Sequence, residues 1–184
     1  MRHGEYENPD KLMPGRSEGF PLSEKGIIET RAAGVFLKDK KIARVFSSPL
    51  LRTKQTAEII AREIGVVGIQ FDDRLLELNV GEYTNRPIEH FEKSGFYQDM
   101  VQSPATVENI DSVCSRISEF LTEKKELSEN ILVVTHVYSV RCFLCTIHGT
   151  ALKDCFQYKP GTSQVFEIYD DINGTKIQSV FPVK

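Results

Sequence analysis

Apolar residues along this chain occur in two patterns, short continuous runs and longer stretches in which they recur every three or four positions. Short runs of β-branched and aliphatic residues are typical of strands buried in a sheet. The longer stretches predict helices, because that spacing places side chains on one face. The predicted strands span residues 42–46, 68–71 and 131–135. The predicted helices span residues 23–40, 50–64, 107–127 and 138–147.

Local end signals support two of these helices. Ser23 is expected to be the N-cap of the first, since a serine hydroxyl accepts a hydrogen bond from a free backbone N–H at a helix start. Gly65 is expected to close the second, because glycine adopts the left-handed conformation that commonly ends helices. The apolar spacing of the first helix predicts its buried face. That face is expected to hold Ile27, Ile28, Arg31, Ala32, Val35 and Phe36.

Two long loops and a hairpin complete the pattern. Residues 5–20 are rich in glycine, proline and charge and predict a long loop, and residues 72–85 predict a second one. Loops of this length are usually functional or disordered. A short helix is expected at Pro87, followed by a loop through Pro104. Near the end, residues 164–169 and 176–181 flank an Asn-Gly turn signal, which predicts a hairpin.

Strands that alternate with helices predict the α/β fold class. We expect a three-layer sandwich in which a mostly parallel central sheet has helices on both faces and a C-terminal hairpin. The 184 residues fit a single domain, residues 1–184, with one sizeable core.

Composition narrows the function class. Hydrophobic residues make up 40% and charged residues 27%, as is ordinary for a soluble globular protein. The net charge of −3 argues against a nucleic-acid partner, which would favour a basic protein. No apolar run is long enough to cross a bilayer and no signal peptide is visible, so we expect a cytoplasmic protein without a membrane partner. The oligomeric state is not readable from the sequence.

Cys142 and Cys145 form a CxxC spacing that can indicate zinc or a redox pair. They lie in an apolar, helix-like run with no second ligand pair nearby. We therefore expect buried structural thiols and no metal site.

Groups suited to bind an anion follow the predicted strands. Ligands in open α/β sheets bind at the carboxyl ends of strands. Arg2 and His3 open the chain, Arg52 lies in the first turn of the helix after residues 42–46, and His136 follows the strongest strand. Arginine supplies a planar fork of donors and a fixed charge, and a neutral imidazole can attack phosphorus. We expect these four residues to meet around a phosphate dianion, with the Glu77 carboxyl group facing it.

These residues and their neighbours resemble the histidine phosphatase superfamily, which includes the cofactor-dependent phosphoglycerate mutases. The resemblance covers the chain from Met1 to about Arg141. The motifs occur in the family's order as Arg2-His3-Gly4-Glu5, Leu22-Ser23-Glu24-Lys25-Gly26, Ser47-Ser48-Pro49-Leu50-Leu51-Arg52-Thr53-Lys54-Gln55-Thr56-Ala57, Arg74-Leu75-Leu76-Glu77, Gly81-Glu82-Tyr83 and Val134-Thr135-His136.

The resemblance implies a role for each residue. His3 is expected to be the nucleophile that becomes phosphohistidine, while Arg2, Arg52 and His136 hold the phosphoryl oxygens. Glu77 is expected to be the general acid, and no metal or other cofactor is implied. The two arginines disfavour the imidazolium form of His3, and Glu77 needs partial burial or the field of the dianion to raise its pKa.

Other residues compete for two of these roles. Glu5 and Glu82 are rivals of Glu77 for the acid role. Many members of the family have an asparagine that contacts phosphate seven residues after the motif's arginine, where this chain has Pro9. Asn8 and Arg16 are the candidate phosphate contacts in its place.

Two further positions depart from the family pattern. The family has a complete apolar strand before Arg-His-Gly, whereas only Met1 precedes Arg2 here, and we expect residues upstream of Met1 to be missing from this sequence. Val137 replaces the glycine that usually follows the second histidine. Its side chain is expected to narrow the pocket or re-aim the backbone N–H there.

The favoured function is a phosphomonoester hydrolase that acts on a small phosphorylated metabolite. The first alternative is a mutase of the phosphoglycerate type, although 184 residues leave little room for the insertions that enclose its intermediate. The second alternative is a weakly active, regulatory phosphate-binding protein, which the departures after His136 and before Arg2 favour.

Overall fold

A computed structural model of the chain describes residues 1–90, 96, 106–172 and 174–182. Short 3₁₀ turns join several of the elements. None of the helices in these residues is long and apolar enough to cross a membrane. The helices and strands are, in chain order, α1 (Glu24–Leu37), β1 (Ile42–Ser47), α2 (Leu51–Ile64), β2 (Ile69–Phe71), α4 (Ile110–Lys124), β3 (Asn130–Val134), α5 (Val137–His148), β4 (Val165–Asp171) and β5 (Gly174–Phe181).

The first three residues connect two groups of strands. Strands β2, β1 and β3 pair in that order and are all parallel, while β4 and β5 form an antiparallel hairpin. Arg2 forms a parallel bridge with Thr135, directly after β3. On its other side, the Arg2 backbone N–H donates to the Gln164 carbonyl oxygen at 3.1 Å. The N-terminal segment therefore lies between β3 and the hairpin.

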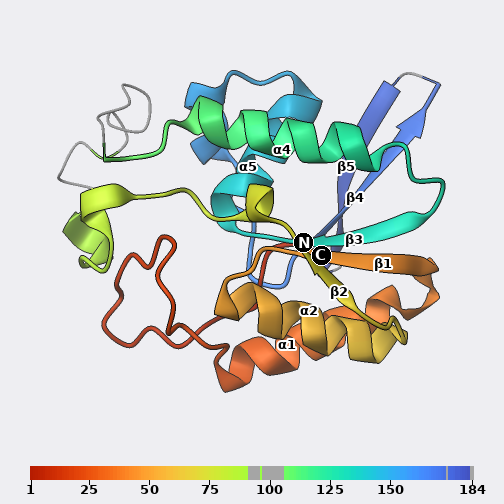
Figure 1. Ribbon diagram of the computed structural model, residues 1–184, viewed down its shortest axis with the longest axis horizontal. Helices are drawn as coiled ribbons and strands as arrows, with labels where there is room; N and C mark the ends of the chain where they lie inside the picture. The colour runs from red at the N-terminus through yellow and green to blue at the C-terminus, as the bar shows by residue number, and fades with distance from the viewer. Residues whose placement is uncertain (91–95, 97–105, 173, 183–184) are drawn as a thin grey trace.

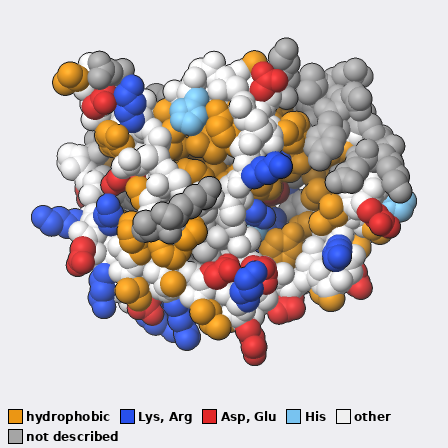
Figure 2. All heavy atoms as spheres, turned by 180° about the vertical axis from the view of Figure 1, so that it is seen from behind, with side chains coloured by type: hydrophobic (Ala, Val, Ile, Leu, Met, Phe, Trp, Pro, Cys, Tyr) orange, Lys and Arg blue, Asp and Glu red, His pale blue; other side chains and the backbone are white. Residues whose placement is uncertain are grey.

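The elements form three layers, as Figure 1 shows. Helices α1 and α2 cover one face of the parallel sheet, and α4 and α5 cover the other. Each face has its own core. On the face shown in Figure 2, side chains of both charges are interspersed and hydrophobic side chains gather between them. The α/β class, the parallel sheet, the helices on both faces and the final hairpin are all confirmed.

The predicted end signals are also confirmed. The Ser23 hydroxyl accepts a hydrogen bond from the Gly26 N–H at 3.0 Å and caps α1. Gly65 closes α2 with a φ of 75°, in the left-handed region. These signals involve residues that are close in sequence, which explains why the helix ends could be predicted from the sequence.

The predicted buried face of α1 is wrong. Ile28 and Val35 are 67% and 61% exposed. The buried face instead carries small or polar residues, because α1 packs closely against neighbouring main chain and against α2. A β-carbon at Gly26 would lie 1.9 Å from the Glu5 carbonyl oxygen. The buried residues of α1 are Gly26, Thr30, Ala33, Gly34 and Leu37.

Two smaller expectations also need correction. Helix α4 begins at Ile110 rather than Val107, since the Asn109 side chain caps it by accepting from the Asp111 N–H. Val107 is buried in the core ahead of the helix. The short helix after Pro87 is a 3₁₀ turn, Ile88–His90. The loop predicted through Pro104 lies outside the described residues.

Candidate active site

His3 is held rigidly at the end of the N-terminal segment. Its backbone N–H donates to the Thr135 carbonyl oxygen at 2.9 Å, and its side chain is 2% exposed. Nδ1 lies 2.7 Å from the Gly4 carbonyl oxygen. Because a carbonyl can only accept a hydrogen bond, Nδ1 carries the hydrogen. In the neutral ring, Nε2 therefore has the free lone pair that a nucleophile needs.

His136 lies beside His3, although the two are far apart in the sequence. It follows β3 as the N-cap residue of α5 and is fully buried. The ring centroids of the two histidines are 5.3 Å apart, in an edge-on arrangement. Nε2 of His136 is hydrogen-bonded to the Ser48 hydroxyl at 2.8 Å. Its Nδ1 is buried and has no hydrogen-bond partner among the described residues.

The two predicted arginines are each fixed by one backbone carbonyl. Arg52, in the first turn of α2, is 2% exposed and donates to the Gly15 oxygen at 2.8 Å. Arg2 donates to the Pro160 oxygen at 2.8 Å. The Nε atoms of both are buried and lack an acceptor within the described part of the chain. Buried donors are nearly always satisfied, so these orphaned atoms indicate a site for an anion.

Glu77 is a buried carboxyl group near both arginines. It is 7% exposed, and its Oε1 accepts from the Leu78 N–H at 2.9 Å and from the Tyr138 N–H at 3.3 Å. Burial raises its pKa above the ordinary value of 4.5, although Arg52 and Arg2 oppose that shift. A protonated carboxyl group near neutral pH can act as an acid.

The rival acids are placed differently. Glu5 forms an exposed ion pair with Lys25 at 2.6 Å, and the same partner lowers its pKa. Glu82 is exposed. Neither has the burial that raises the pKa of Glu77.

Both histidines are held in the neutral form. Burial is the largest cause that lowers the pKa of His3, followed by the charges of Arg2 and Arg52. The pKa of His136 is lowered by burial first and then by Arg52. The direction for His3 agrees with the sequence-based expectation, but the expectation named only the arginines and missed the larger effect of burial.

Asn8 and Arg16 are engaged elsewhere. The Asn8 amide closes its own loop by bonding both the carbonyl oxygen and the N–H of Leu12. Arg16 donates to the Glu77 carbonyl oxygen and pairs with Glu108, each at 2.8 Å. The structure therefore gives Arg16 a connection to Glu77 that the sequence did not suggest.

Three further residues shape the site and were not singled out from the sequence. The Tyr6 ring packs against His3 and lies under the Arg52 guanidinium, with centroid distances of 5.4 and 5.7 Å. Ser48 orients His136, and the Thr56 hydroxyl accepts from the Gly4 N–H at 3.0 Å. Ser48 and Thr56 belong to the motif that runs from Ser47 to Ala57, so that motif is the sequence signal by which they could have been found.

The CxxC residues are buried free thiols, as expected. Within the ranges that the structure describes, no three His, Cys, Asp or Glu side chains are grouped in a way that could hold a metal ion.

The sequence and the fold of the chain are both similar to those of known proteins. A family model described as the histidine phosphatase superfamily, branch 1, matches residues 1–180. The chain is 41% identical over 92 residues to fructose-2,6-bisphosphatase TIGAR from Bos taurus, a match that covers 48% of this chain and 34% of TIGAR. This match therefore spans only about a third of that relative's length.

A longer match is to the probable phosphoglycerate mutase GpmB from Salmonella choleraesuis. It is 32% identical over 159 residues, and covers 81% of this chain and 73% of GpmB. Among solved structures, YhfR from Bacillus stearothermophilus superposes with a TM-score of 0.86 at 22% identity. That superposition covers 100% of this chain and 95% of YhfR, and it shows the shared fold.

Proposed function

Because the chain belongs to the histidine phosphatase superfamily, we propose that it hydrolyses a small-molecule phosphate monoester through a phosphohistidine at His3. The observation that carries this proposal is the group of three orphaned, buried nitrogen atoms. They are Nε of Arg2, Nε of Arg52 and Nδ1 of His136. All three belong to residues around the His3 ring, where a phosphoryl group would satisfy them.

In the first step, Nε2 of His3 attacks phosphorus and the bond from phosphorus to the leaving oxygen breaks. Glu77 gives its proton to that oxygen, so an alcohol leaves and Glu77 becomes a carboxylate. Arg2, Arg52 and His136 stabilise the charge on the equatorial oxygens of the phosphoryl group. Since the guanidinium groups supply the positive charge, we propose that the reaction needs no metal.

In the second step, a water molecule attacks phosphorus and the P–N bond breaks. The Glu77 carboxylate takes a proton from that water, which restores the acid. Inorganic phosphate leaves, and the neutral His3 ring is ready for another cycle. Atoms and charge balance over the two steps, and no other reactant is needed.

A mutase is the second candidate, and the similarity to GpmB favours it. A mutase would use the same first step, but the phosphohistidine would pass its phosphoryl group to another hydroxyl of the same substrate rather than to water. The two functions therefore differ in the acceptor of the phosphoryl group, which is water for the hydrolase and a hydroxyl for the mutase. The described residues do not favour either acceptor.

The decisive experiment measures phosphate release from p-nitrophenyl phosphate and from fructose-2,6-bisphosphate, with and without EDTA. We expect phosphate release that persists in EDTA and is lost in His3→Ala. In parallel, conversion of 3-phosphoglycerate to 2-phosphoglycerate with a bisphosphate primer tests the mutase. Phosphate binding without turnover in either assay would instead identify a regulatory phosphate-binding protein.

A further inference from the structure

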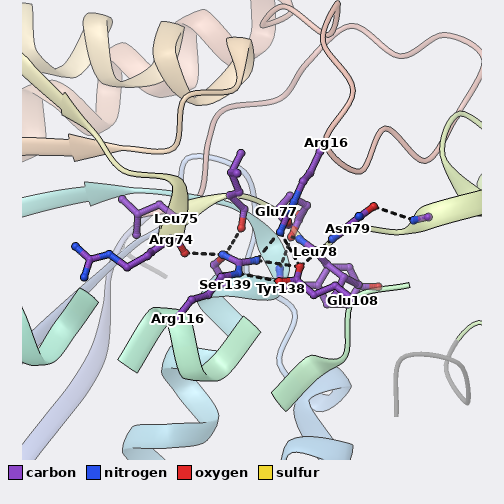
Figure 3. A network of polar contacts seen from close by, with 12 residues as sticks. Arg16, Arg74, Leu75, Glu77, Leu78, Asn79, Glu108, Arg116, Tyr138 and Ser139 are labelled. Carbon is purple, nitrogen blue, oxygen red and sulfur yellow. Dashed lines mark hydrogen bonds and ion pairs between the residues drawn. The ribbon is translucent and has the colours of Figure 1, made fainter. Parts of the chain in front are cut away.

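The main chain that carries Glu77 is held by side chains from distant elements. Residues 76–80 have no regular secondary structure, and at their two ends the Leu76 N–H and the Val80 carbonyl oxygen bond to the adjoining 3₁₀ turns. In addition, the four successive carbonyl oxygens of residues 74–77 each accept a hydrogen bond from a side chain (Figure 3). The pairs are Arg74 with Arg116, Leu75 with Thr135, Leu76 with Ser139, and Glu77 with Arg16 and Arg116.

Two of these donors are joined by one carboxylate. Glu108 Oε2 accepts from Arg16 at 2.8 Å, and Oε1 accepts from Nε of Arg116 at 3.0 Å. We call these three residues the Glu108 bridge. Glu108 and Arg116 are largely buried, with side chains 13% and 14% exposed, whereas Arg16 is 34% exposed. Charge-assisted hydrogen bonds between side chains this well buried fix the positions of those side chains better than surface ion pairs do.

The bridge connects three parts of the chain to one carbonyl group. Arg16 comes from the first long loop, Glu108 precedes α4, and Arg116 lies within α4. Both arginines donate to the Glu77 oxygen, at 2.8 and 3.3 Å. Glu108 also accepts from the Asn79 N–H at 3.0 Å, two residues after Glu77. The backbone is therefore held on both sides of the proposed acid.

The side chain of Glu77 is oriented from the opposite direction. Its Oε1 accepts from the N–H groups of Leu78 and Tyr138. These two donors leave Oε2 as the oxygen that carries the proton in the acid role. The position of Oε2 depends on that of the Glu77 backbone. A carboxyl group displaced by about 1 Å no longer reaches the leaving oxygen well, so a shift of the backbone would slow the reaction.

We propose that Glu108 is a positioning residue for the general acid, acting through Arg16 and Arg116 on the main chain of Glu77. This inference rests on the proposed function. It also assigns Arg16 to the positioning of Glu77 rather than to a phosphate contact.

The leaving group of the substrate separates this role from a merely structural one. A p-nitrophenolate ion leaves without much help from an acid, whereas an alkoxide leaves only when it is protonated. Misplacing Glu77 therefore slows alkyl phosphates much more than aryl phosphates. A general loss of folded protein slows both equally.

The experiment compares kcat/KM for β-glycerol phosphate and for p-nitrophenyl phosphate in Glu108→Gln. We expect about a tenfold loss or more for the alkyl substrate, a fraction of the 10²- to 10⁴-fold typical of a general acid, and a change within about threefold for the aryl substrate. Glu123→Gln is the matched control, since Glu123 lies on α4, the helix of Arg116, and forms its ion pairs with Arg74 and Lys124 from an exposed position. It is expected to leave both values unchanged.

Two further variants make the result decisive. Arg16→Met removes one arm of the bridge at a residue exposed enough to be replaced without loss of folding, and it is expected to show the same selective loss. In a Glu77→Gln background, Glu108→Gln is expected to cause no further change in the ratio of the two kcat/KM values, because the acid is already absent.

Other results would overturn the assignment. Equal losses for both substrates in Glu108→Gln would indicate a structural role only, and kcat/KM values that are unchanged for both substrates would indicate no role. Weaker inhibition by inorganic phosphate in Arg16→Met, with losses for both substrates, would make Arg16 a phosphate contact. A wild-type protein that turns over neither substrate would overturn the proposed function itself, and this assignment with it.

Discussion

The imidazole rings of His3 and His136 lie with their centroids 5.3 Å apart and their planes inclined at 62°. One ring comes from the N-terminal segment and the other from the N-cap residue of α5, and the backbone bridge between Arg2 and Thr135 sets their spacing. Both rings are buried, so two positions that are distant in sequence lie together in the interior with two guanidinium groups nearby.

Orthovanadate, which resembles a phosphoryl group in transfer, should bind and stabilise the protein. At 100 times its Kd, a ligand adds about 2.7 kcal/mol to the free energy of unfolding. Arg52→Lys should weaken binding by about 10- to 100-fold, as expected when hydrogen bonds to a charged group are lost. Thermal unfolding against vanadate concentration measures this. Arg62→Lys, at an exposed position on α2, is the control, and equal weakening in both variants would contradict the assignment of Arg52.

Acid should destabilise the fold through the two histidines. Because the folded protein lowers both pKa values below 6.5, the unfolded chain binds these protons first as pH falls. Stability is then fully present above pH 6.5 and decreases below it, by about 1.4 kcal/mol per pH unit for each histidine. The raised pKa of Glu77 acts in the opposite sense, since the folded protein takes up that proton first.

Urea unfolding of the wild type and of His136→Gln at about pH 7 and about pH 5.5 measures this dependence. The variant should lose about half of the histidine-dependent difference between the two pH values. A difference that is identical in the two proteins would mean that His136 is not held neutral in the fold.

The activity should depend on the protonation of Glu77. Its raised pKa keeps the acid form present above pH 4.5, and kcat/KM for an alkyl phosphate should fall as pH rises through that pKa. Glu77→Gln should remove this alkaline limb and lower kcat/KM for the alkyl substrate by about 10²- to 10⁴-fold. The pH profile of the variant checks the assignment, and an alkaline limb that survives would exclude Glu77 as its source.

The elements could be predicted because their signals are local. Ser23 and Gly65 mark helix ends through contacts within a few residues, and the continuous run before His136 marks its strand. The proximity of the site residues followed from one rule, that strand ends meet at one edge of a parallel sheet. The placement of residues 1–3 between β3 and the hairpin was not readable from periodicity, because three residues carry no pattern.

Other features depend on contacts that no periodicity encodes. The exposed Ile28 and Val35 contradict the apolar spacing of α1, because the helix meets neighbouring main chain too closely for large side chains. The Glu108 bridge joins three charged residues from separate segments. Glu108 and Arg116 look like ordinary surface charges in the sequence, and Arg16 was expected to contact phosphate instead. Burial, rather than charge alone, sets the pKa of His3, and burial became visible only in the fold.

The four thiols should react slowly in the native protein. Burial raises the pKa values of Cys145 and Cys155 to about 11, so only about one thiol in a thousand is a thiolate at pH 8. Ellman's reagent should label four thiols in denaturant and do so about 100-fold faster than in the native protein. Rapid native labelling of either residue would contradict the buried structural role.

Gly26→Ala should destabilise the protein and reduce its activity. Alanine favours a helix over glycine by about 1 kcal/mol, which alone predicts a more stable α1. The added β-carbon, however, would lie 1.9 Å from the Glu5 carbonyl oxygen and 2.8 Å from the Glu5 nitrogen, and main chain cannot rotate away as a side chain can. Overpacking of this kind costs about 1 to 3 kcal/mol, so the steric effect wins.

Thermal unfolding and phosphate release measure the two effects of Gly26→Ala together. Gly161→Ala is the control, since its β-carbon would lie 3.6 Å from the Gln164 side chain, an ordinary contact, and should change stability by less than about 0.5 kcal/mol. Because Glu5 is only two residues from His3, relief of the clash by a shift of the main chain moves the proposed nucleophile. Activity should therefore fall in Gly26→Ala even at temperatures where the variant is fully folded, and full activity there would show that His3 is insulated from α1.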